Sequence, residues 1–394
     1  MFYYLITFLF CFIIELDPRL RKSKTMRVLL TLWLYGFLCF GYMVGSDWRS
    51  YELDFQQSYD MLENFKTTLY PAFYVISDLF KFISEDFFVF RGFLNIVYLH
   101  SIFYVIRKIF GKINFIAIVF FSQFLFFMLI GGPLKFLCAS IFIMYATGAF
   151  LEDKIKKWLL ISFTSIFFHF SAAFILVFIF IIWKFRDKIV LVKNSFWFVS
   201  YFIILILTSE ISFFDRLFNG FLNLSLPEAV LNKILGYSIE NVNNLFSLGS
   251  LKSSVFFLLV LFNKNKIINF SKNGVLIFAM AISYSIIFRI LIVIPIGFRI
   301  TMYSSIFLYI SLLIIFYQSY QNLNLRSLLK RYMIVSLITI PAILNIWQGY
   351  DYLPYSNSLQ YITIRDHLPY YYRYNYNYIE SKKRTGKNYI DEKE

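Results

Sequence analysis

Charged residues are scarce in this sequence of 394 residues. Asp, Glu, Lys and Arg make up 15% of the chain, whereas soluble domains carry about 25%. Hydrophobic residues make up 59%, and no long polar block separates the apolar stretches between Met1 and Trp347. A separate soluble domain of ordinary size, about 100 residues, is therefore excluded. We predict one integral membrane domain over 1–347 and a polar, Tyr-rich tail over 348–394.

The groups that soluble enzymes use are also few. The chain has three histidines and three cysteines, and Cys11, Cys39 and Cys138 lie in or beside apolar runs without paired spacing. This pattern argues against a disulfide framework or a metal site. No GxGxxG motif, phosphate-binding loop or serine triad is present. We therefore expect no metal and no cofactor.

Apolar segments of near-helical length recur along the chain. A membrane-spanning helix needs about 20 apolar residues, with a range of about 17–25. The sequence predicts an all-α polytopic membrane protein with about 12 such segments. They lie near 2–16, 28–44, 87–106, 113–130, 136–151, 158–169, 171–183, 195–208, 253–262, 274–296, 300–317 and 332–347. The first is expected to be a retained helix, because its basic residues follow the apolar run and no cleavage site is present.

The basic residues predict the orientation of these segments. Cytoplasmic loops keep an excess of Lys and Arg, so the net charge of +15 reflects orientation signals, and nucleic acid is excluded as a partner. Six loops, predicted to be cytoplasmic, hold 21 of the 38 basic residues: 17–27, 107–112, 152–157, 184–193, 263–272 and 318–331. The loop 45–86 has eight acids and three bases, and 209–252 has four acids and three bases. Both are predicted to face the periplasm or exterior.

The apolar run 158–183 needs a special explanation, because basic loops lie at both of its ends. A simple crossing would place one basic loop outside. Two short limbs that turn near His169, Ser171 and Ala172 keep both basic ends inside, so we predict a broken-helix hairpin. A break at membrane depth is tolerated where it is buried in protein or lines a cavity. His169 is therefore expected at a cavity.

Ionisable residues at membrane depth are few, and each costs about 2.5–3.5 kcal/mol on insertion scales. Arg91 is expected to be a structural partner of an acid such as Glu85 or Asp86. Arg289 and Arg299 flank a stretch interrupted by Pro and Gly. Two guanidiniums beside a broken helix suit a pyrophosphate, because Arg offers planar, bidentate donors.

These cations also have structural interpretations. Arg289 could instead form a buried ion pair, and Arg299 could anchor its helix at the interface. Lys135 follows a Gly-Gly-Pro sequence at another outer edge. It could supply a third cation to a pyrophosphate or anchor its helix in the membrane.

The start of the acidic outer loop suits sugar recognition. Asp47, Tyr51 and Asp54 fall on one face if this stretch is helical. Carboxylates accept hydrogen bonds from sugar hydroxyls, and Trp48 and Tyr51 can pack against the apolar faces of pyranose rings. The alternative is a solvated acidic loop.

Four stretches of the sequence match motifs of a known family. They are Gly45-Ser-Asp47-Trp-Arg-Ser-Tyr51, Tyr70-Pro-Ala-Phe-Tyr74, Ser165-Ile-Phe-Phe-His169-Phe-Ser-Ala-Ala173 and Gly297-Phe-Arg299-Ile-Thr-Met-Tyr303. Together they resemble the EpsG/Wzy family of exopolysaccharide and O-antigen polymerases, and the resemblance runs through most of the chain. Two departures from the family pattern are present: Lys135-Phe136 replaces an Arg-Gln pair, and the Tyr-Pro stretch lacks its usual preceding Glu.

This resemblance implies a GT-C-like membrane fold in the bacterial inner membrane. It implies a polymerase that joins oligosaccharide repeats carried on undecaprenyl pyrophosphate, on the periplasmic side. Membrane lipid and a chain-length regulator protein are the further partners to test. An O-antigen ligase or another lipid-donor glycosyltransferase, and a lipid-linked oligosaccharide flippase, remain alternatives. The absence of internal repeats argues against the flippase.

Under this interpretation the candidate site residues take three roles. The general base is His169 or Asp47, and the sequence leaves the choice open. The pyrophosphate is expected to be bound by Arg299, Arg289 and Lys135. The sugar is expected to be bound by Trp48, Arg49, Tyr51 and Tyr303.

Overall fold

The described part of the chain is α-helical. The computed structural model describes residues 2–45, 47–57, 70–208, 248–291, 301–320, 325–348, 355, 357–360, 375 and 379. Over these residues no strand occurs, and the single extended pairing is an isolated bridge between Gly41 and Asn357. The all-α part of the predicted fold is confirmed. The GT-C-like arrangement stays a prediction.

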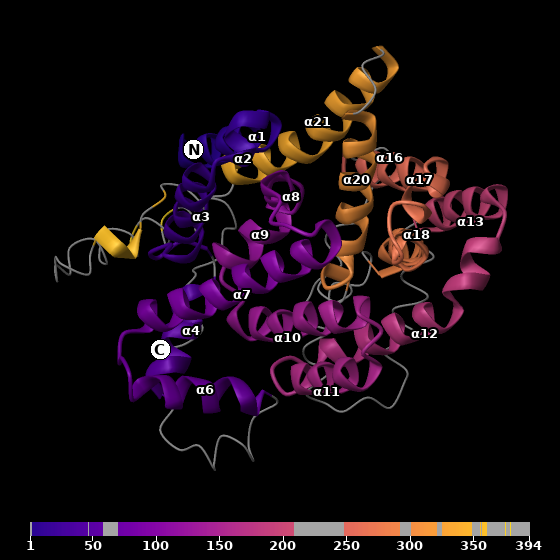
Figure 1. Ribbon diagram of the computed structural model, residues 1–394. Coiled ribbons are helices and arrows are strands. Elements are labelled where there is room, and N and C mark those ends of the chain that lie inside the picture. Colours follow the sequence, from indigo (N-terminus) through magenta and orange to yellow (C-terminus); the bar gives the residue numbers. More distant parts are fainter. Residues whose placement is uncertain are drawn as a thin grey trace, which may run out of the picture. The chain divides into compact units, whose positions relative to one another are not determined.

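Two compact units make up the chain. Unit 1 comprises Met1–Phe170 and Ile338–Glu394, and unit 2 comprises Ser171–Leu337. The helices of unit 1, labelled in Figure 1, are α1 (Phe2–Leu16), α2 (Pro18–Lys22), α3 (Lys24–Cys39), α4 (Trp48–Gln57), α6 (Pro71–Lys81), α7 (Phe87–Phe110), α8 (Phe115–Phe120), α9 (Ser122–Leu129), α10 (Leu134–Leu151) and α11 (Ile155–Ile166).

Unit 2 is built from one continuous part of the chain. Its helices are α12 (Ser171–Leu191), α13 (Asn194–Leu207), α16 (Leu248–Phe262), α17 (Lys264–Ile268), α18 (Gly274–Leu291) and α20 (Ser305–Tyr320). Helix α21 (Leu325–Gln348), which contains Pro341, runs from unit 2 into unit 1. A short 3-10 helix, Ser358–Gln360, follows in unit 1.

Local sequence signals explain where several helices begin and end. Asp86 starts α7, because its Oδ1 accepts hydrogen bonds from the backbone N–H of Phe88 at 2.7 Å and Val89 at 3.3 Å. Such caps satisfy orphan amides at a helix start. Gly111 ends the same helix with φ of 74°, a left-handed conformation that glycine adopts readily. Polar residues at the ends therefore delimit a helix whose middle is apolar.

Among the described residues, four helices are long and apolar enough to cross a membrane: α7, α10, α18 and the part of α21 from Ser327 to Leu344. The pair α12 and α13 would add a fifth if it forms one span, although the two helices are bent by 120°. The remaining apolar helices are shorter. Helix is present in each of the 12 predicted segments, but the number of membrane crossings is not confirmed. One reason is that the predicted segment 113–130 is divided into two short helices, α8 and α9, and neither is long enough to cross a membrane.

The predicted break near His169 is present. Helix α11 ends at Ile166 and α12 begins at Ser171. Our expectation that both limbs are short is wrong for the second limb, because α12 continues to Leu191 and has 21 residues. The sequence alone suggested an end near 183, where charged residues begin, yet those residues extend the helix.

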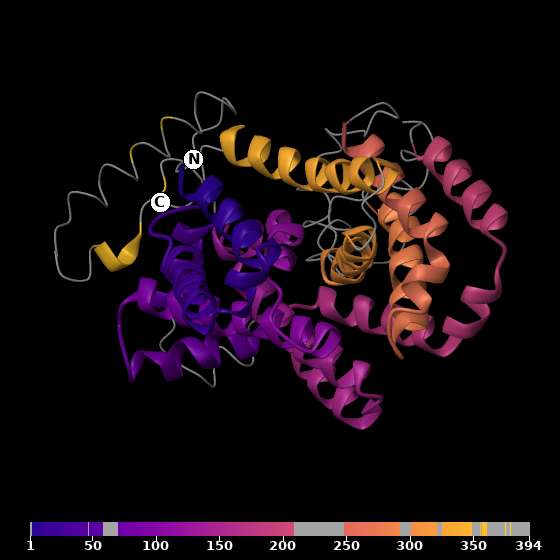
Figure 2. The same cartoon turned by 45° about the horizontal axis from the view of Figure 1, so that its top comes forward.

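Helices α10 and α11 form an antiparallel pair. Figures 1 and 2 show them side by side within unit 1. At one end the rings of Phe150 and Trp158 are 5.5 Å apart, and at the other end those of Phe136 and His169 are 5.4 Å apart. The chain therefore returns to the Lys135 end of α10 when it reaches His169.

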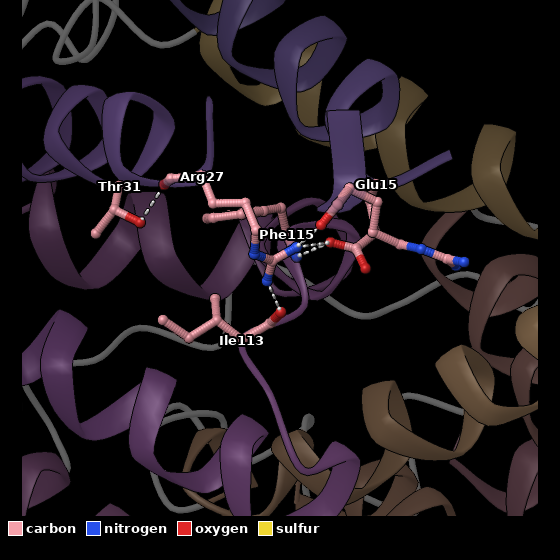
Figure 3. A network of polar contacts seen from close by, with 6 residues as sticks. Glu15, Arg27, Thr31, Ile113 and Phe115 are labelled. Atoms are coloured by element: carbon pink, nitrogen blue, oxygen red, sulfur yellow. Dashed lines mark hydrogen bonds and ion pairs between the residues drawn. The ribbon is translucent and has the colours of Figure 1, made fainter. Parts of the chain in front are cut away.

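Loops that were predicted to share one membrane face contact each other in unit 1. In Figure 3, Arg27 of α3 points toward Glu15 of α1, and the Nη1–Oε2 distance is 3.3 Å. Arg27 Nη2 also donates to the Ile113 carbonyl at 2.5 Å. Farther along, Glu152 pairs with both Lys108 and Lys154. The Lys108–Glu152 pair joins the loops 107–112 and 152–157, and Arg27 connects the loop 17–27 to Ile113, which directly follows the loop 107–112.

Unit 2 shows the same grouping of basic loops. Lys264 donates to the carbonyl of Val192 at 3.2 Å, which joins the loops 263–272 and 184–193. Lys330 donates to Asn263 Oδ1 at 2.6 Å, which joins 318–331 to 263–272. Within each unit, the loops are grouped as the charge pattern indicates. The assignment of this group to the cytoplasm stays a prediction.

The C-terminal segment returns to the end of α3. Asn357 Nδ2 donates to the Gly36 carbonyl and Ser358 N–H to the Phe40 carbonyl, both at 2.7 Å. The Tyr355 hydroxyl donates to the Phe37 carbonyl. The last carbonyls of a helix have no partner within the helix. The tail therefore caps the C-terminus of α3, directly before the segment that leads to Asp47.

Candidate functional site

Lys135 stands at the centre of a polar cluster in unit 1. It lies in the first turn of α10, and its Nζ donates to Asp54 Oδ2 at 2.8 Å and to the Tyr74 hydroxyl at 2.9 Å. The Lys135 side chain is 14% exposed and that of Asp54 is 27% exposed. From the sequence, Lys135 was predicted to bind a pyrophosphate as a third cation or to anchor its helix in the membrane. In the structure it has a carboxylate partner.

Aromatic rings surround the same ammonium. The Nζ atom lies 4.7 Å from the ring centre of Tyr74, 5.5 Å from Phe73, 5.6 Å from Tyr70 and 5.7 Å from Tyr51. A cation within about 6 Å of a ring face is attracted by the ring quadrupole. The cluster of Lys135, Asp54 and these four aromatic residues, called here the lysine cluster, is electrically balanced and only partly buried.

His169 adjoins the lysine cluster. Its ring stacks on Tyr70 with centres 5.3 Å apart and an interplanar angle of 11°. It also meets the ring of Phe136 edge-on, at 86°. The Ala72 N–H donates to the Phe167 carbonyl at 3.4 Å, which holds the Tyr70-Pro-Ala stretch against the turn that carries His169. His169 is half-buried, and its position at a cavity stays a prediction.

Helix α4 brings the first outer-loop motif to the lysine cluster. Tyr51 and Asp54 lie on one side of this helix, because both contact Lys135, and Asp47 directly precedes α4. Arg49 forms an ion pair of 2.7 Å with Glu52. Trp48 is 3% exposed and packs 6.1 Å from the ring of Phe88. Of the two predicted sugar-facing aromatics, Tyr51 is therefore the one beside the lysine cluster.

Arg91 has different partners from those expected. Its Nη2 donates to the backbone carbonyls of Val44 at 3.0 Å, Ile130 at 2.9 Å and Leu129 at 3.4 Å. In the described part of the chain it makes no ion pair, so the prediction of a Glu85 or Asp86 partner is wrong. Asp86 instead caps the start of α7. Carbonyls at a helix C-terminus carry partial negative charge, and those at the end of α9 replace the expected acid.

Arg289 in unit 2 is bound by neutral oxygens. Its Nε donates to the Tyr201 hydroxyl at 3.2 Å and its Nη1 to Ser250 Oγ at 3.1 Å. Its Nη2 donates to the Ser250 carbonyl at 2.7 Å and to Ser253 Oγ at 2.5 Å. The side chain is buried, with 2% exposure. Among the described residues it has no acidic partner, so the buried ion pair considered as an alternative is not found there.

The remaining candidates lie apart from the lysine cluster in the sequence. Tyr303 in unit 2 is 1% exposed, and its hydroxyl is 3.2 Å from Ser171 Oγ. Arg299 lies outside the described residues. The structure therefore brings Asp47, Tyr51, Lys135 and His169 into one unit, and Arg289 and Tyr303 into the other. Among the described residues, no three His, Cys, Asp or Glu side chains form a group that could hold a metal ion.

Four partners of Lys135 were not linked to it from the sequence: Asp54, Tyr70, Phe73 and Tyr74. Asp54 was placed on the right helical face, but nothing linked it to Lys135, which is 81 residues away. Tyr70 and Tyr74 belong to a stretch that was recognised by resemblance alone. One signal could have identified them: two tyrosines four residues apart lie on one side of a helix turn and can share a cation.

Comparison with known proteins gives one match. Neither the curated proteins nor the solved structures that were compared match the chain. A family model does match, and it covers residues 24–357, which is most of the chain and includes every candidate residue. The predicted resemblance is confirmed, and the chain belongs to the EpsG family.

Proposed function

We propose that this protein is a membrane glycosyltransferase that polymerises oligosaccharide repeat units carried on undecaprenyl pyrophosphate. Membership of the EpsG family supports a polysaccharide polymerase function in general. The observation that carries the finer proposal is that three family-like stretches meet in unit 1. Tyr51 from the first, Tyr70 and Tyr74 from the second and His169 from the third lie around Lys135. The products would be O-antigen, capsule or exopolysaccharide.

The lysine cluster has the chemistry of a sugar site. Its aromatic rings have the character that packs against a pyranose, and Asp54 and the tyrosine hydroxyls can bond sugar hydroxyls. Arg49, Trp48 and Tyr303 are retained as further candidates for sugar contacts. In the reaction, a bond forms between an acceptor hydroxyl oxygen and the anomeric carbon of the donor. The bond from that carbon to the pyrophosphate oxygen breaks, and the lipid pyrophosphate leaves.

The acceptor proton must pass to a base, and the candidates are His169 and Asp47. A positioned base contributes typically about 10²–10⁴-fold to rate. His169 stacks on Tyr70 beside the lysine cluster, whereas Asp47 precedes α4. The test compares His169→Ala with Asp47→Asn. The variant that lacks the base should bind the lipid-linked donor and fail to elongate it. Wild-type elongation by both variants would exclude both residues as the base.

Arg289 and Arg299 are proposed to bind the leaving pyrophosphate. The guanidinium of Arg289 is surrounded by neutral oxygens in the described part of the chain, so its positive charge is available to an anion. Lys135 is the weaker candidate for this role, since Asp54 balances its charge. Arg299→Lys should be strongly impaired, because one ammonium cannot replace a planar fork. Normal polymerisation by a folded Arg299→Ala variant would contradict the assignment.

The reaction is proposed to take place on the periplasmic face of the inner membrane. This orientation rests on the excess of Lys and Arg in the six loops described above. Single cysteines in a cysteine-free background test it: Ser58→Cys and Ser225→Cys should both react with an impermeant reagent once the outer membrane is permeable. Protection of Ser225→Cys alone would show that an odd number of membrane crossings separates the loops 45–86 and 209–252. That result would contradict the predicted hairpin near His169.

Reconstitution with a purified lipid-linked repeat unit is the decisive experiment. A polymerase should produce a ladder of products from this substrate alone, and addition of a chain-length regulator protein should narrow the ladder. Transfer only after a second acceptor is added would favour an O-antigen ligase. Movement of the intact substrate across the bilayer without transfer would favour a flippase.

A further inference from the structure

Arg91 has hydrogen-bonding capacity that the protein does not use. Its side chain is 1% exposed, and among the described residues only Nη2 has acceptors, the three carbonyls described above. Its Nε and Nη1 atoms are buried and have no hydrogen-bond partner in the described part of the chain. A guanidinium has five N–H donors, and buried polar groups are nearly always paired. The unpaired N–H groups therefore indicate that a ligand completes this site.

The N-terminus of α4 approaches the same place. If Gly132 carried a Cβ atom, that atom would lie 3.5 Å from Arg91 Nη2 and 3.8 Å from the backbone nitrogen of Trp48. Trp48 is the first residue of α4, which has 10 residues. First-turn amides point out of a helix N-terminus, which carries partial positive charge and commonly binds phosphate groups. A guanidinium and a helix N-terminus thus meet beside a glycine.

Glycines keep the surrounding backbone close. Gly45 has φ of 94°, and a Cβ there would lie 2.2 Å from the Ile130 carbonyl oxygen. The backbone before α4 therefore packs directly on the Ile130-Gly131 backbone, where no side chain fits. Asp47 is the acid whose charge acts on Arg91. An anion that binds here must compete with Asp47.

We propose that Arg91, the N-terminus of α4 and Gly132 bind the phosphate groups of a lipid-linked sugar. This inference rests on the proposed function and extends it. Joining two lipid-linked repeat units requires two lipid pyrophosphates, because one leaves with the donor lipid and the other stays on the acceptor. Unit 1 supplies Arg91 and unit 2 supplies Arg289, each buried and, among the described residues, without an ion-pair partner. Each unit then anchors one substrate.

Binding of inorganic pyrophosphate tests the Arg91 site without requiring glycosyl transfer. The probe is titrated calorimetrically into the full-length protein in lipid nanodiscs at low salt. Arg91→Lys should lower the affinity of one class of site for pyrophosphate about tenfold, which is the loss expected for one hydrogen bond to a charged group. Arg107→Lys, an exposed position on the same helix, is the matched control and should bind like the wild type. Unchanged binding by folded Arg91→Lys would overturn the proposal.

Asp47→Asn gives an independent measurement if Arg91→Lys does not fold. Removing the competing carboxylate should tighten pyrophosphate binding about threefold, as expected for a partly screened charge. A purely structural Arg91 would leave the affinity of Asp47→Asn unchanged, and that result would overturn the proposal. Arg289→Lys should weaken pyrophosphate binding at the Arg289 site and leave binding at the Arg91 site unchanged.

Polymer formation then identifies the substrate that Arg91 anchors. A single lipid-linked repeat serves as acceptor and a preformed lipid-linked chain as donor. Arg91→Lys should raise KM for one of these two substrates and leave the other unchanged. Pyrophosphate binding at Arg91 without a product ladder would contradict the polymerase proposal alone. A ladder with wild-type pyrophosphate binding in Arg91→Lys would contradict the Arg91 site alone.

Discussion

Lys135 in unit 1 and Arg289 in unit 2 keep a positive charge inside an apolar protein in different ways. Lys135 has a carboxylate, a phenol hydroxyl and four aromatic rings around it. The partners of Arg289 in the described part of the chain are hydroxyls and a backbone carbonyl. A charge paired with a carboxylate is balanced, whereas one solvated by neutral oxygens still attracts an anion.

This difference separates two roles that sequence alone could not separate. Both residues are cations near the ends of apolar segments, and both were assigned to the pyrophosphate. Their partners support our proposals that Lys135 organises a sugar site and that Arg289 is the better anion ligand. The comparison also predicts that substitution of the two residues affects stability differently, because only Lys135 would leave a charged partner behind.

The largest effect should come from Arg289→Lys. We expect polymer formation to fall about 100-fold, the loss typical of removing one donor that stabilises a transition state. Stability should change little, since the neutral oxygens of Tyr201 and Ser250 keep other partners. The measurement is the product ladder together with thermal unfolding, with Arg331→Lys as control. Full activity would show that polymer formation does not require the guanidinium of Arg289.

Lys135→Met should have the next largest effect, this time on stability. It leaves Asp54 partly buried without its cation, and we expect a loss of about 3 kcal/mol. The double variant Lys135→Met with Asp54→Leu should regain most of that loss, which a double-mutant cycle measures. Additive effects of the two substitutions would show that the pair is not coupled and would remove the contrast with Arg289.

A smaller effect is expected where the tail joins unit 1. Tyr355→Phe removes a hydrogen bond to the Phe37 carbonyl and should cost about 1 kcal/mol. Burial raises the pKa of the Tyr355 phenol, so this hydroxyl stays protonated and can donate. Tyr332→Phe, at a position 65% exposed, is the control. Hydrogen exchange should quicken at the end of α3 and not in α18; equal changes in both would contradict a role confined to unit 1.

The smallest effect concerns pH at the loop that joins α10 and α11. Hydrogen bonds from Lys108 and Lys154 lower the pKa of Glu152 to about 2, below the value of about 4.3 for an unperturbed Glu. A lowered pKa in the folded state stabilises the protein above the unfolded value, and this contribution is lost as pH falls from about 4.3 to about 2. Glu152→Gln should remove that pH dependence in thermal unfolding. An unchanged profile would show that the pair is too solvated to contribute.

Much of the fold followed from local sequence signals. Helix occurs in each apolar segment, and the break before Ser171 lies where the basic loops required it. The end of α12 was misjudged, because charge alone does not end a helix when its residues have good helix propensity. The number of crossings was not confirmed, because hydropathy marks apolar residues but does not give the length of the helix that contains them.

The sequence by itself determined the class of protein, the family and the residue types available for chemistry. These depend on composition, on the spacing of apolar and basic residues, and on short motifs, all of which are local. Tertiary structure alone decided which residues meet: Lys135 with Asp54, His169 with Tyr70, and Arg91 with carbonyls in place of an acid. The reason is physical, since a buried cation binds whatever oxygen or ring the packing of distant helices brings to it.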